Sequence, residues 1–512
     1  MTPKDDLFRL IKSLTRSEKR YVKLFASLYG GQKKYLALFD AIDAQSTYDE
    51  GALRERFKNE RFTAQLTAAK RYLYDQILRS LRACHEKTDA RARIRRLIQN
   101  MEILYHKGLR DQARAMFDSA LQLAIEREDF VSWIEAISWM ESMQPTLVAD
   151  DDGIKFVHDT FIDAFTRYRN LVDIGVAARQ IALPLRGGQP RSLEDLEELD
   201  RAIDRIPAVD LSVRASIARC TAMATYHFAR NEYPQALTHI DRELALFENN
   251  PALIDADPRA YIWAINNKLV LLKRAGDFKT FDTVLEATKV RSQKLLVGRG
   301  LWTHRLRAEF FAVITLNRAN YSLALQLTDK YPDLANEIRR ELGEHQRYLR
   351  RHVQMKFHMD LTLMYFALGD YRAALEMNNR ITSDIRPDQG WETFHQARLM
   401  SLVIHYELGN IELLENLIVS TCRFFRSRKI MHAFESIVLD FFRRLVRLKA
   451  GRENLLRLFI ETRERLNPLQ NDPLEANAFR YFQYIGWMDG KIDALRTTRA
   501  PCRRTLEASS MD

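Results

Sequence analysis

Apolar residues in the segment Asp360–Arg380 recur at helical spacing, stop at a glycine and then resume. The first run consists of Leu361, Met364, Tyr365 and Leu368. This spacing places one apolar stripe along one face of a helix. Gly369 follows where that helix would end, and glycine adopts the left-handed backbone of a helix terminus at little cost. Ala374 is small enough to let a returning helix approach closely, so the segment predicts a helical hairpin.

The same pattern of hinge, returning apolar residue and small or apolar residue recurs along most of the chain. The expected hinges are Gly108, Asn231, Gly276, Ala319, Gly369, Gly409, Gly451 and a weaker Gly490. From Asn231 onward they are 45, 43, 50, 40, 42 and 39 residues apart. Hairpins repeated at such an interval are typical of an α-solenoid. The sequence therefore predicts an all-α fold, an α-solenoid of helical hairpins.

Two of these units resemble the tetratricopeptide repeat. The residues that carry the resemblance are Leu361, Tyr365, Gly369, Tyr371 and Ala374 in one unit, and Gly108, Ala113, Phe117 and Ala120 in another. The resemblance covers most of residues 91–500, although the usual repeat of 34 residues is shorter than these intervals. The opening Leu10–Ala26 also looks like the start of uncharacterised bacterial proteins of this type. The resemblance implies an array of TPR-like hairpins that binds other proteins.

The N-terminal region predicts five helices, which form a separate helical bundle over residues 1–90. A cap at Thr2, with Pro3 in the first turn, starts the first helix. Capping boxes start two others, Thr15–Glu18 for a helix over Arg16–Leu28 and Thr47–Glu50 for a helix ending at Phe57. The remaining two are expected over Lys33–Ala44 and after a cap at Thr63. Residues 91–500 then form the repeat array, with a break near 184–192, and 501–512 form a flexible tail.

Positive charge is concentrated in this N-terminal region. The whole chain carries a net charge of +11. Residues 1–96 contain 22 Lys and Arg against 12 Asp and Glu, a net of +10, and the remaining residues are almost neutral. A second basic stretch, Arg423–Arg457, has ten Lys and Arg against three acids.

The basic N-terminal region has two interpretations. It is either a polar cap of the repeat array or a helix-turn-helix-like head that binds nucleic acid. In the second interpretation Arg54, Lys58, Arg61, Lys70 and Arg71 contact phosphates.

No recognisable catalytic, cofactor or metal motif occurs in the chain. The phosphate-binding loop, the dinucleotide fingerprint, the nucleophile elbow and the zincin motif are all missing. The only E-x-x-H pair, Glu392–His395, lacks the second copy that a di-iron bundle needs. Four scattered cysteines, no bilayer-length apolar run and no signal peptide predict a cytoplasmic protein without membrane contact. We expect no enzyme activity, cofactor or metal.

Many tetratricopeptide proteins hold a partner's carboxyl terminus with Lys, Asn and Arg at the fifth and ninth positions of each first helix. That clamp is absent here. The corresponding positions include Asn266, Val270, Met359, Leu363, Leu399 and Val403. They form a candidate partner groove of largely apolar character, suited to an amphipathic helix, and the alternative is that these side chains are core.

The function predicted first is a non-enzymatic scaffold that binds a protein or peptide. The alternative is a DNA-binding transcription regulator with the basic head and a repeat-built sensor domain. An enzyme of unrecognised kind is a third alternative, because function resides in sites rather than in folds. The partner, the process and the oligomeric state stay open.

Overall fold

The computed structural model contains only helices among its described residues. These residues are 5–28, 33–85, 90–143, 151–182, 193–206, 212–296, 303–383, 391–428, 430–448, 451–472, 475, 478–479 and 482–497. The predicted all-α fold is therefore confirmed. Three predictions, the cap at Thr2 and Pro3, the break near 184–192 and the tail at 501–512, lie outside the described residues. None of the described helices has the length and apolarity needed to cross a membrane.

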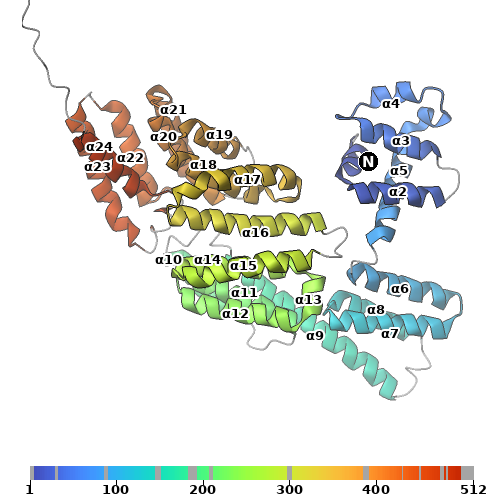
Figure 1. Cartoon of the computed structure of the whole chain (residues 1–512). Helices are drawn as coiled ribbons and strands as arrows, with labels where there is room; N and C mark the ends of the chain where they lie inside the picture. Colours follow the sequence, from blue (N-terminus) through green and yellow to red (C-terminus); the bar gives the residue numbers. More distant parts are fainter. Residues whose placement is uncertain are drawn as a thin grey trace, which may run out of the picture. The chain divides into compact units, whose positions relative to one another are not determined.

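The chain divides into two compact units, and the first comprises Met1–Phe165 together with the short segment Val297–Thr303. Its helices, coloured blue to cyan in Figure 1, are α1 (Asp6–Ser13), α2 (Arg16–Leu28), α3 (Lys33–Ala44), α4 (Glu50–Arg56), the 3-10 helix η1 (Arg61–Gln65), α5 (Leu66–His85), α6 (Ala90–His106), α7 (Arg110–Glu126) and α8 (Phe130–Met143). The long helix α9 (Asp151–Ala182) continues from the first unit into the second.

Helices α1 to α5 enclose a core of their own, which includes Ile11, Leu38, Phe39 and Ile77. The predicted bounds of α2 and α3 are confirmed. The capping box before α2 is also confirmed, since the Thr15 N–H donates to Glu18 Oε2 at 2.7 Å and the Glu18 N–H donates to Thr15 Oγ1 at 3.2 Å.

Two predicted caps in this bundle are wrong. Asp49, not Thr47, caps α4, because its carboxylate accepts the Ala52 N–H at 3.0 Å. Thr63 lies inside η1 and donates its hydroxyl to the carbonyl of Phe57 instead of capping α5. A Ser, Thr or Asp near a helix start can satisfy several different backbone groups, and packing decides which.

The second unit comprises Thr166–Leu296 and His304–Asp512. After the end of α9 its helices are α10 (Leu193–Ile203), α11 (Val213–Ala229), α12 (Tyr233–Asn249), α13 (Pro251–Ala256), α14 (Pro258–Ala275), α15 (Phe278–Leu295), α16 (Thr303–Ala324), α17 (Tyr331–His345), α18 (Arg351–Ala367), α19 (Tyr371–Thr382), α20 (Trp391–Glu407), α21 (Ile411–Ser427), α22 (Ala433–Arg447), α23 (Arg452–Leu466) and α24 (Tyr484–Thr497). Three 3-10 helices lie among them, η4 (Thr328–Lys330), η5 (Gln346–Tyr348) and η6 (Asn467–Gln470). From α17 to α24 each α-helix packs against the next along the chain, as does α11 against α12 and α14 against α15 (Figure 1).

Five of the expected hinges end a helix in the left-handed conformation. They are Gly108, Asn231, Gly276, Gly369 and Gly409, with φ between 61° and 77°. At Gly369 the next N–H, that of Asp370, donates back to the carbonyl of Tyr365 at 3.0 Å and closes the turn. Asp370 then caps α19 by accepting the Ala373 N–H, so two adjacent residues end one helix and begin the next.

Three other expected hinges differ from the prediction. Ala319 is a buried residue inside α16, and Gly490 lies inside α24. Gly451 precedes α23 with an extended backbone (φ 164°) rather than a left-handed one. The left-handed turn after α16 falls instead at Gln326 (φ 53°), and Glu128 (φ 48°) makes another between α7 and α8. A small residue can lie at a turn between helices or inside a helix where a neighbour packs closely. A prediction from residue size alone therefore places these hinges wrongly.

Adjacent cores of the second unit share helices. One face of α16 contributes Phe310 and Val313 to the core with α14 and α15, and another contributes Ala308 and Ala312 to the core with α17 and α18. Helix α18 is likewise divided between that core and the C-terminal one. A helix buried on two sides must be apolar around most of its circumference. Successive hairpins that share their cores in this way are compatible with a helical repeat fold.

Candidate functional site

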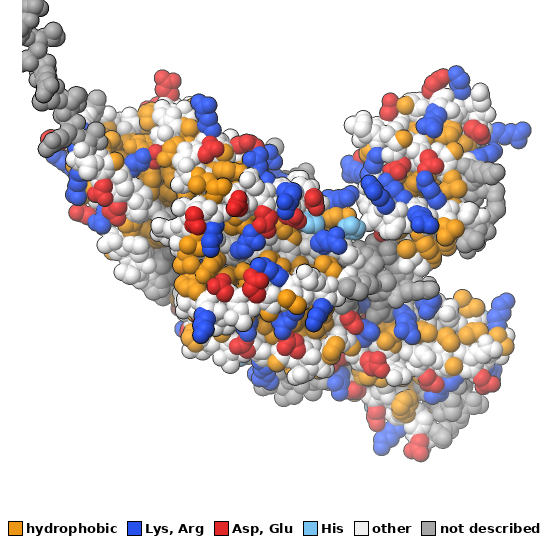
Figure 2. Space-filling view, in the orientation of Figure 1, with side chains coloured by type: hydrophobic (Ala, Val, Ile, Leu, Met, Phe, Trp, Pro, Cys, Tyr) orange, Lys and Arg blue, Asp and Glu red, His pale blue; other side chains and the backbone are white. Residues whose placement is uncertain are grey.

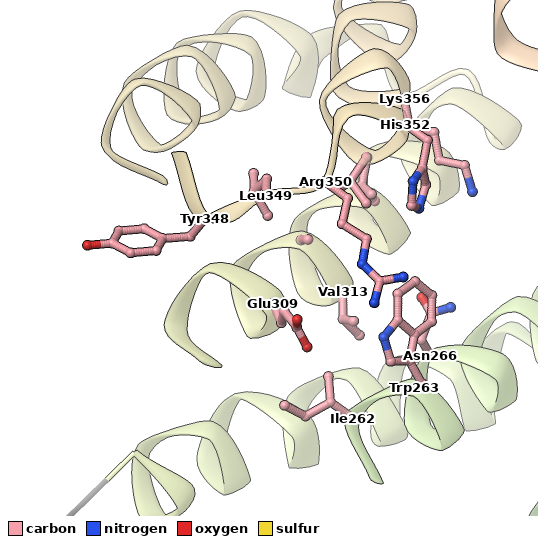
Figure 3. A pocket seen from close by; sticks show the side chains of 13 residues that line it. Ile262, Trp263, Asn266, Glu309, Val313, Tyr348, Leu349, Arg350, His352 and Lys356 are labelled. Atoms are coloured by element: carbon pink, nitrogen blue, oxygen red, sulfur yellow. The ribbon is translucent and has the colours of Figure 1, made fainter. Parts of the chain in front are cut away.

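A small pocket of the second unit lies between α14, α16 and the start of α18, and we call it the α14–α18 pocket. It encloses about 60 Å³. Its lining residues are Ile262, Trp263, Asn266, Glu309, Ala312, Val313, Leu316, Tyr348, Leu349, Arg350, His352, Val353 and Lys356 (Figure 3). The lining combines an apolar floor with several charged side chains.

Local structure fixes the positions of these side chains. Trp263 and Asn266 lie one turn apart on α14, so both reach the same side of the helix. The turn before α18 is held by Gln354, whose amide donates to the carbonyls of Gln346 at 2.8 Å and Leu349 at 2.9 Å. Arg350 follows in an extended conformation, and its guanidinium lies above Trp263 in Figure 3.

Opposite charges line the α14–α18 pocket, and they are not matched to each other. Glu309 Oε1 lies 2.6 Å from Arg259 Nε, outside the pocket lining. The other carboxylate oxygen, Oε2, is buried and has no hydrogen-bond partner among the described residues. The exposed Arg350 side chain forms no ion pair with the part of the chain that the structure describes. Glu309 therefore lies closed beneath the pocket surface, where Arg259 and Arg305 pair with it, and the Arg350 guanidinium is the charged group that the pocket offers to a ligand.

A buried polar ladder runs from the α14–α18 pocket across the three helices. Asn317 Nδ2 donates to Asn266 Oδ1 at 3.0 Å. Farther along, Lys273 Nζ donates to Asn320 Oδ1 at 3.1 Å, and Asn320 Nδ2 donates to Asp360 Oδ2 at 3.0 Å. Burial raises the pKa of Asp360 to about 7, against the opposing effect of nearby lysines. These bonds fix the register of α14, α16 and α18 and orient Asn266.

The six residues of the predicted partner groove divide into two groups. Asn266 and Val270 are half-buried, and Asn266 lines the α14–α18 pocket. Met359, Leu363, Leu399 and Val403 are buried and belong to the C-terminal core. For these four residues the placement fits the alternative interpretation as core.

The five residues of the predicted nucleic-acid site also divide. Lys70 Nζ lies 2.7 Å from Glu50 Oε2 and donates to Tyr48 Oη, and only 13% of its side chain is exposed. Arg54 also pairs with Glu50, and hydrogen bonds from Lys70 and Arg54 lower the pKa of Glu50 to about 2. Lys58 pairs with Glu55. Arg61 and Arg71 are exposed, and neither pairs with a carboxylate of a described residue.

Basic and acidic side chains of α1 to α5 alternate on the face shown in Figure 2. No continuous positive surface is visible on that face of the bundle.

Three histidines of this region, His345, His352 and His358, have separate environments. His352 lines the α14–α18 pocket, and burial lowers the pKa of His358 to about 4, so that His358 is neutral at physiological pH. His345 lies on α17 with Glu341 and Glu344, and the possible metal-binding atoms of the three are within 4.8 Å of one another. Glu341 is also paired with Arg340. All three side chains come from one helix, so they would leave most of a cation's coordination sphere open.

Sequence patterns did not identify the charged side of the α14–α18 pocket. Arg350 and Lys356 do not occupy the fifth or ninth position of a first helix, and their approach to α14 depends on how α18 packs. The residue type of Trp263 was the one available signal, since tryptophan is enriched at binding surfaces, and the structure leaves this side chain 38% exposed. No family model matches the chain, and no curated protein matches it.

Proposed function

We propose that the chain is a non-enzymatic scaffold of TPR-like helical hairpins that binds a short segment of a partner protein in the α14–α18 pocket. The observation that carries the proposal is the partly exposed indole of Trp263 below the exposed Arg350 guanidinium in one pocket. A peptide offers both an apolar side chain for the indole and an acidic side chain for the guanidinium.

The size of the α14–α18 pocket favours a peptide side chain over a cofactor. Pockets for drug-sized ligands enclose roughly 300–1,000 Å³, and this one encloses about 60 Å³. Such a volume suits one anchoring side chain, with the rest of the segment lying along the surface. Anchors of this kind carry most of the binding energy of an interface.

The DNA-binding alternative has weaker support. Lys70, Arg54 and Lys58 are each paired with a carboxylate of the bundle. A cation that is already paired neutralises a DNA phosphate less well, so fewer counterions leave the DNA and binding is weaker. We also propose a cytoplasmic location, where thiols stay reduced; among the described residues, Cys84, Cys220 and Cys422 form no disulfide bond.

Selection of a displayed library of linear peptides against the full chain tests the proposal. We expect enriched peptides to share an acidic residue near an aromatic or aliphatic one. Their affinity, measured by fluorescence anisotropy, should fall about tenfold or more in Arg350→Ala and in Trp263→Ala.

Arg372→Ala is the matched control, since Arg372 is exposed on α19 and lies outside the pocket. It should leave the affinity unchanged. Enriched peptides that bind the two pocket variants as tightly as the wild type would refute this assignment of the site.

A further inference from the structure

A second pocket, between α21 and α22, is lined by arginines, and we call it the arginine pocket. It has a volume of about 620 Å³. Its apolar side is formed by Ile418 and Val419, and its polar side by Cys422, Arg423, Arg426 and Arg443. This pocket lies within the basic stretch that the sequence shows at Arg423–Arg457.

Among the described residues, no carboxylate lines the arginine pocket. The nearest acid of α21 is the exposed Glu415, one turn before Val419 and two turns before Arg423. On α22, Asp440 Oδ2 accepts from Arg465 Nη1 at 2.7 Å. The pocket therefore has one exposed acid, Glu415, beyond its apolar side, whereas Asp440 is already paired.

The arginines themselves keep most of their donors free. Arg443 Nη2 donates to Cys422 Sγ at 3.1 Å, and a thiol is a weak acceptor. Arg423 and Arg426 are exposed and form no ion pair with any described residue. The helix dipole of α21 favours positive charge near its C-terminal end and can explain Arg423 and Arg426 there. It does not explain Arg443, which belongs to α22. Three like charges that line one hollow repel each other unless an anion joins them.

We infer that the arginine pocket binds a small polyanion that carries adjacent phosphoryl groups. Guanidinium groups bind phosphate oxygens in a bidentate manner, and three of them can serve two neighbouring phosphates. The volume lies in the range of small-molecule sites. This inference does not depend on the proposed peptide site, which lies on other helices.

Adjacent phosphoryl groups occur both in free inorganic pyrophosphate and in nucleotide polyphosphates. Val419 is 58% exposed beside the arginines, so a base could pack against it and Ile418. A nucleotide that binds more tightly than pyrophosphate would assign the site to nucleotides, and equal affinities would assign it to the phosphates alone. Both outcomes support the inference.

Isothermal titration of the full chain with pyrophosphate, ATP and adenosine, at constant ionic strength, provides the test. We expect pyrophosphate and ATP to bind and adenosine not to bind. Arg423→Gln and Arg426→Gln should each weaken pyrophosphate binding about tenfold or more. Both side chains are exposed, so the fold of these variants should persist, and circular dichroism checks this.

Arg457→Gln is the matched control because Arg457 is exposed on α23, outside the pocket, and its loss changes the net charge equally. It should leave the affinity unchanged. Absence of pyrophosphate binding to the wild type would overturn the inference. Equal weakening by Arg457→Gln would also overturn it, because the binding would then reflect net charge alone. Binding of duplex DNA without binding of pyrophosphate would equally contradict it.

Discussion

At the scale of single residues, the most informative group is the buried carboxyl of Asp360. It lies on α18, contacts Asn320 and is removed from water, and its pKa is raised to about 7 by burial. A buried polar group costs stability unless it is hydrogen-bonded. The ladder through Asn320 to Lys273 supplies those bonds, so the residue fixes how the helices align rather than adding much net stability.

The raised pKa makes stability depend on pH. In the unfolded chain an Asp carboxyl loses its proton near pH 4. The folded chain therefore binds more protons between about pH 4 and pH 7, and the free energy of unfolding falls as pH rises across that window. We expect Asp360→Asn to melt at the wild-type temperature near pH 4 and roughly 2 °C or more higher at pH 8.

Thermal unfolding at several pH values measures this difference. Burial raises the pKa of Glu243 to about 7 as well, but Glu243 is present in both proteins and cancels in the comparison. Glu415→Gln, an exposed change of equal charge on α21, is the control. If the difference in melting temperature between Asp360→Asn and the wild type did not vary with pH, the Asp360 carboxyl would not be buried as described.

At the scale of elements, the glycine hinges decide where helices end. Gly369 and Gly490 both match the repeat pattern, yet one ends α18 with φ +77° and the other lies inside α24. Apart from the neighbouring residues and the local helix backbone, no described atom lies within 4 Å of a Cβ added at either position. Backbone conformation alone therefore separates the two positions.

Alanine substitution at these two glycines should have opposite effects. Gly369→Ala forces a side chain into the left-handed region and should lower the free energy of unfolding by about 1 kcal/mol. Gly490→Ala improves helix propensity and should raise the free energy by roughly 0.5–1 kcal/mol. Hydrogen exchange of the peptides around each site measures both changes. If Gly490→Ala instead lowered the free energy of unfolding, Gly490 would be a hinge as the sequence pattern predicts, and not a residue inside a helix.

At the scale of the molecule, contacts distant in sequence close the C-terminal end of the second unit. Trp487 on α24 donates its indole N–H to Glu407 of α20 at 2.6 Å, and Lys491 pairs with the same carboxylate. The indole also packs against the rings of Tyr406 and Phe459. Helix α24 thus packs against the end of α20, whose Glu407 lies 80 residues before Trp487.

Removal of this indole should loosen α20 as well as α24. We expect Trp487→Ala to cost about 3 kcal/mol, since it leaves a cavity and removes one of the hydrogen bonds to Glu407. Hydrogen exchange in 391–407 should accelerate together with exchange in 484–497. Trp263→Ala, at a partly exposed position on α14, should leave exchange in both segments unchanged. Acceleration confined to α24 would contradict the role of Trp487 in holding α20.

Much of the fold could be predicted because its signals are local. Helices α2 and α3 have their predicted bounds, and five left-handed hinges are where the pattern puts them. The prediction failed where one residue type serves two purposes, as at Ala319, which is small in order to pack inside α16. Sequence spacing cannot distinguish a small residue that turns the chain from one that admits a neighbouring helix.

The sequence by itself determined that the chain is helical, the bounds of α2 and α3 and five of the left-handed turns between helices, because helix propensity, capping and apolar periodicity act within a few residues. Only the tertiary structure decided which side chains are available to a ligand. It buried Met359 and Leu399, paired Lys70 with Glu50, and placed Arg350 beside Trp263 and Arg443 beside Arg423. Exposure and charge pairing depend on neighbours from other helices, and no local pattern encodes which helices those are.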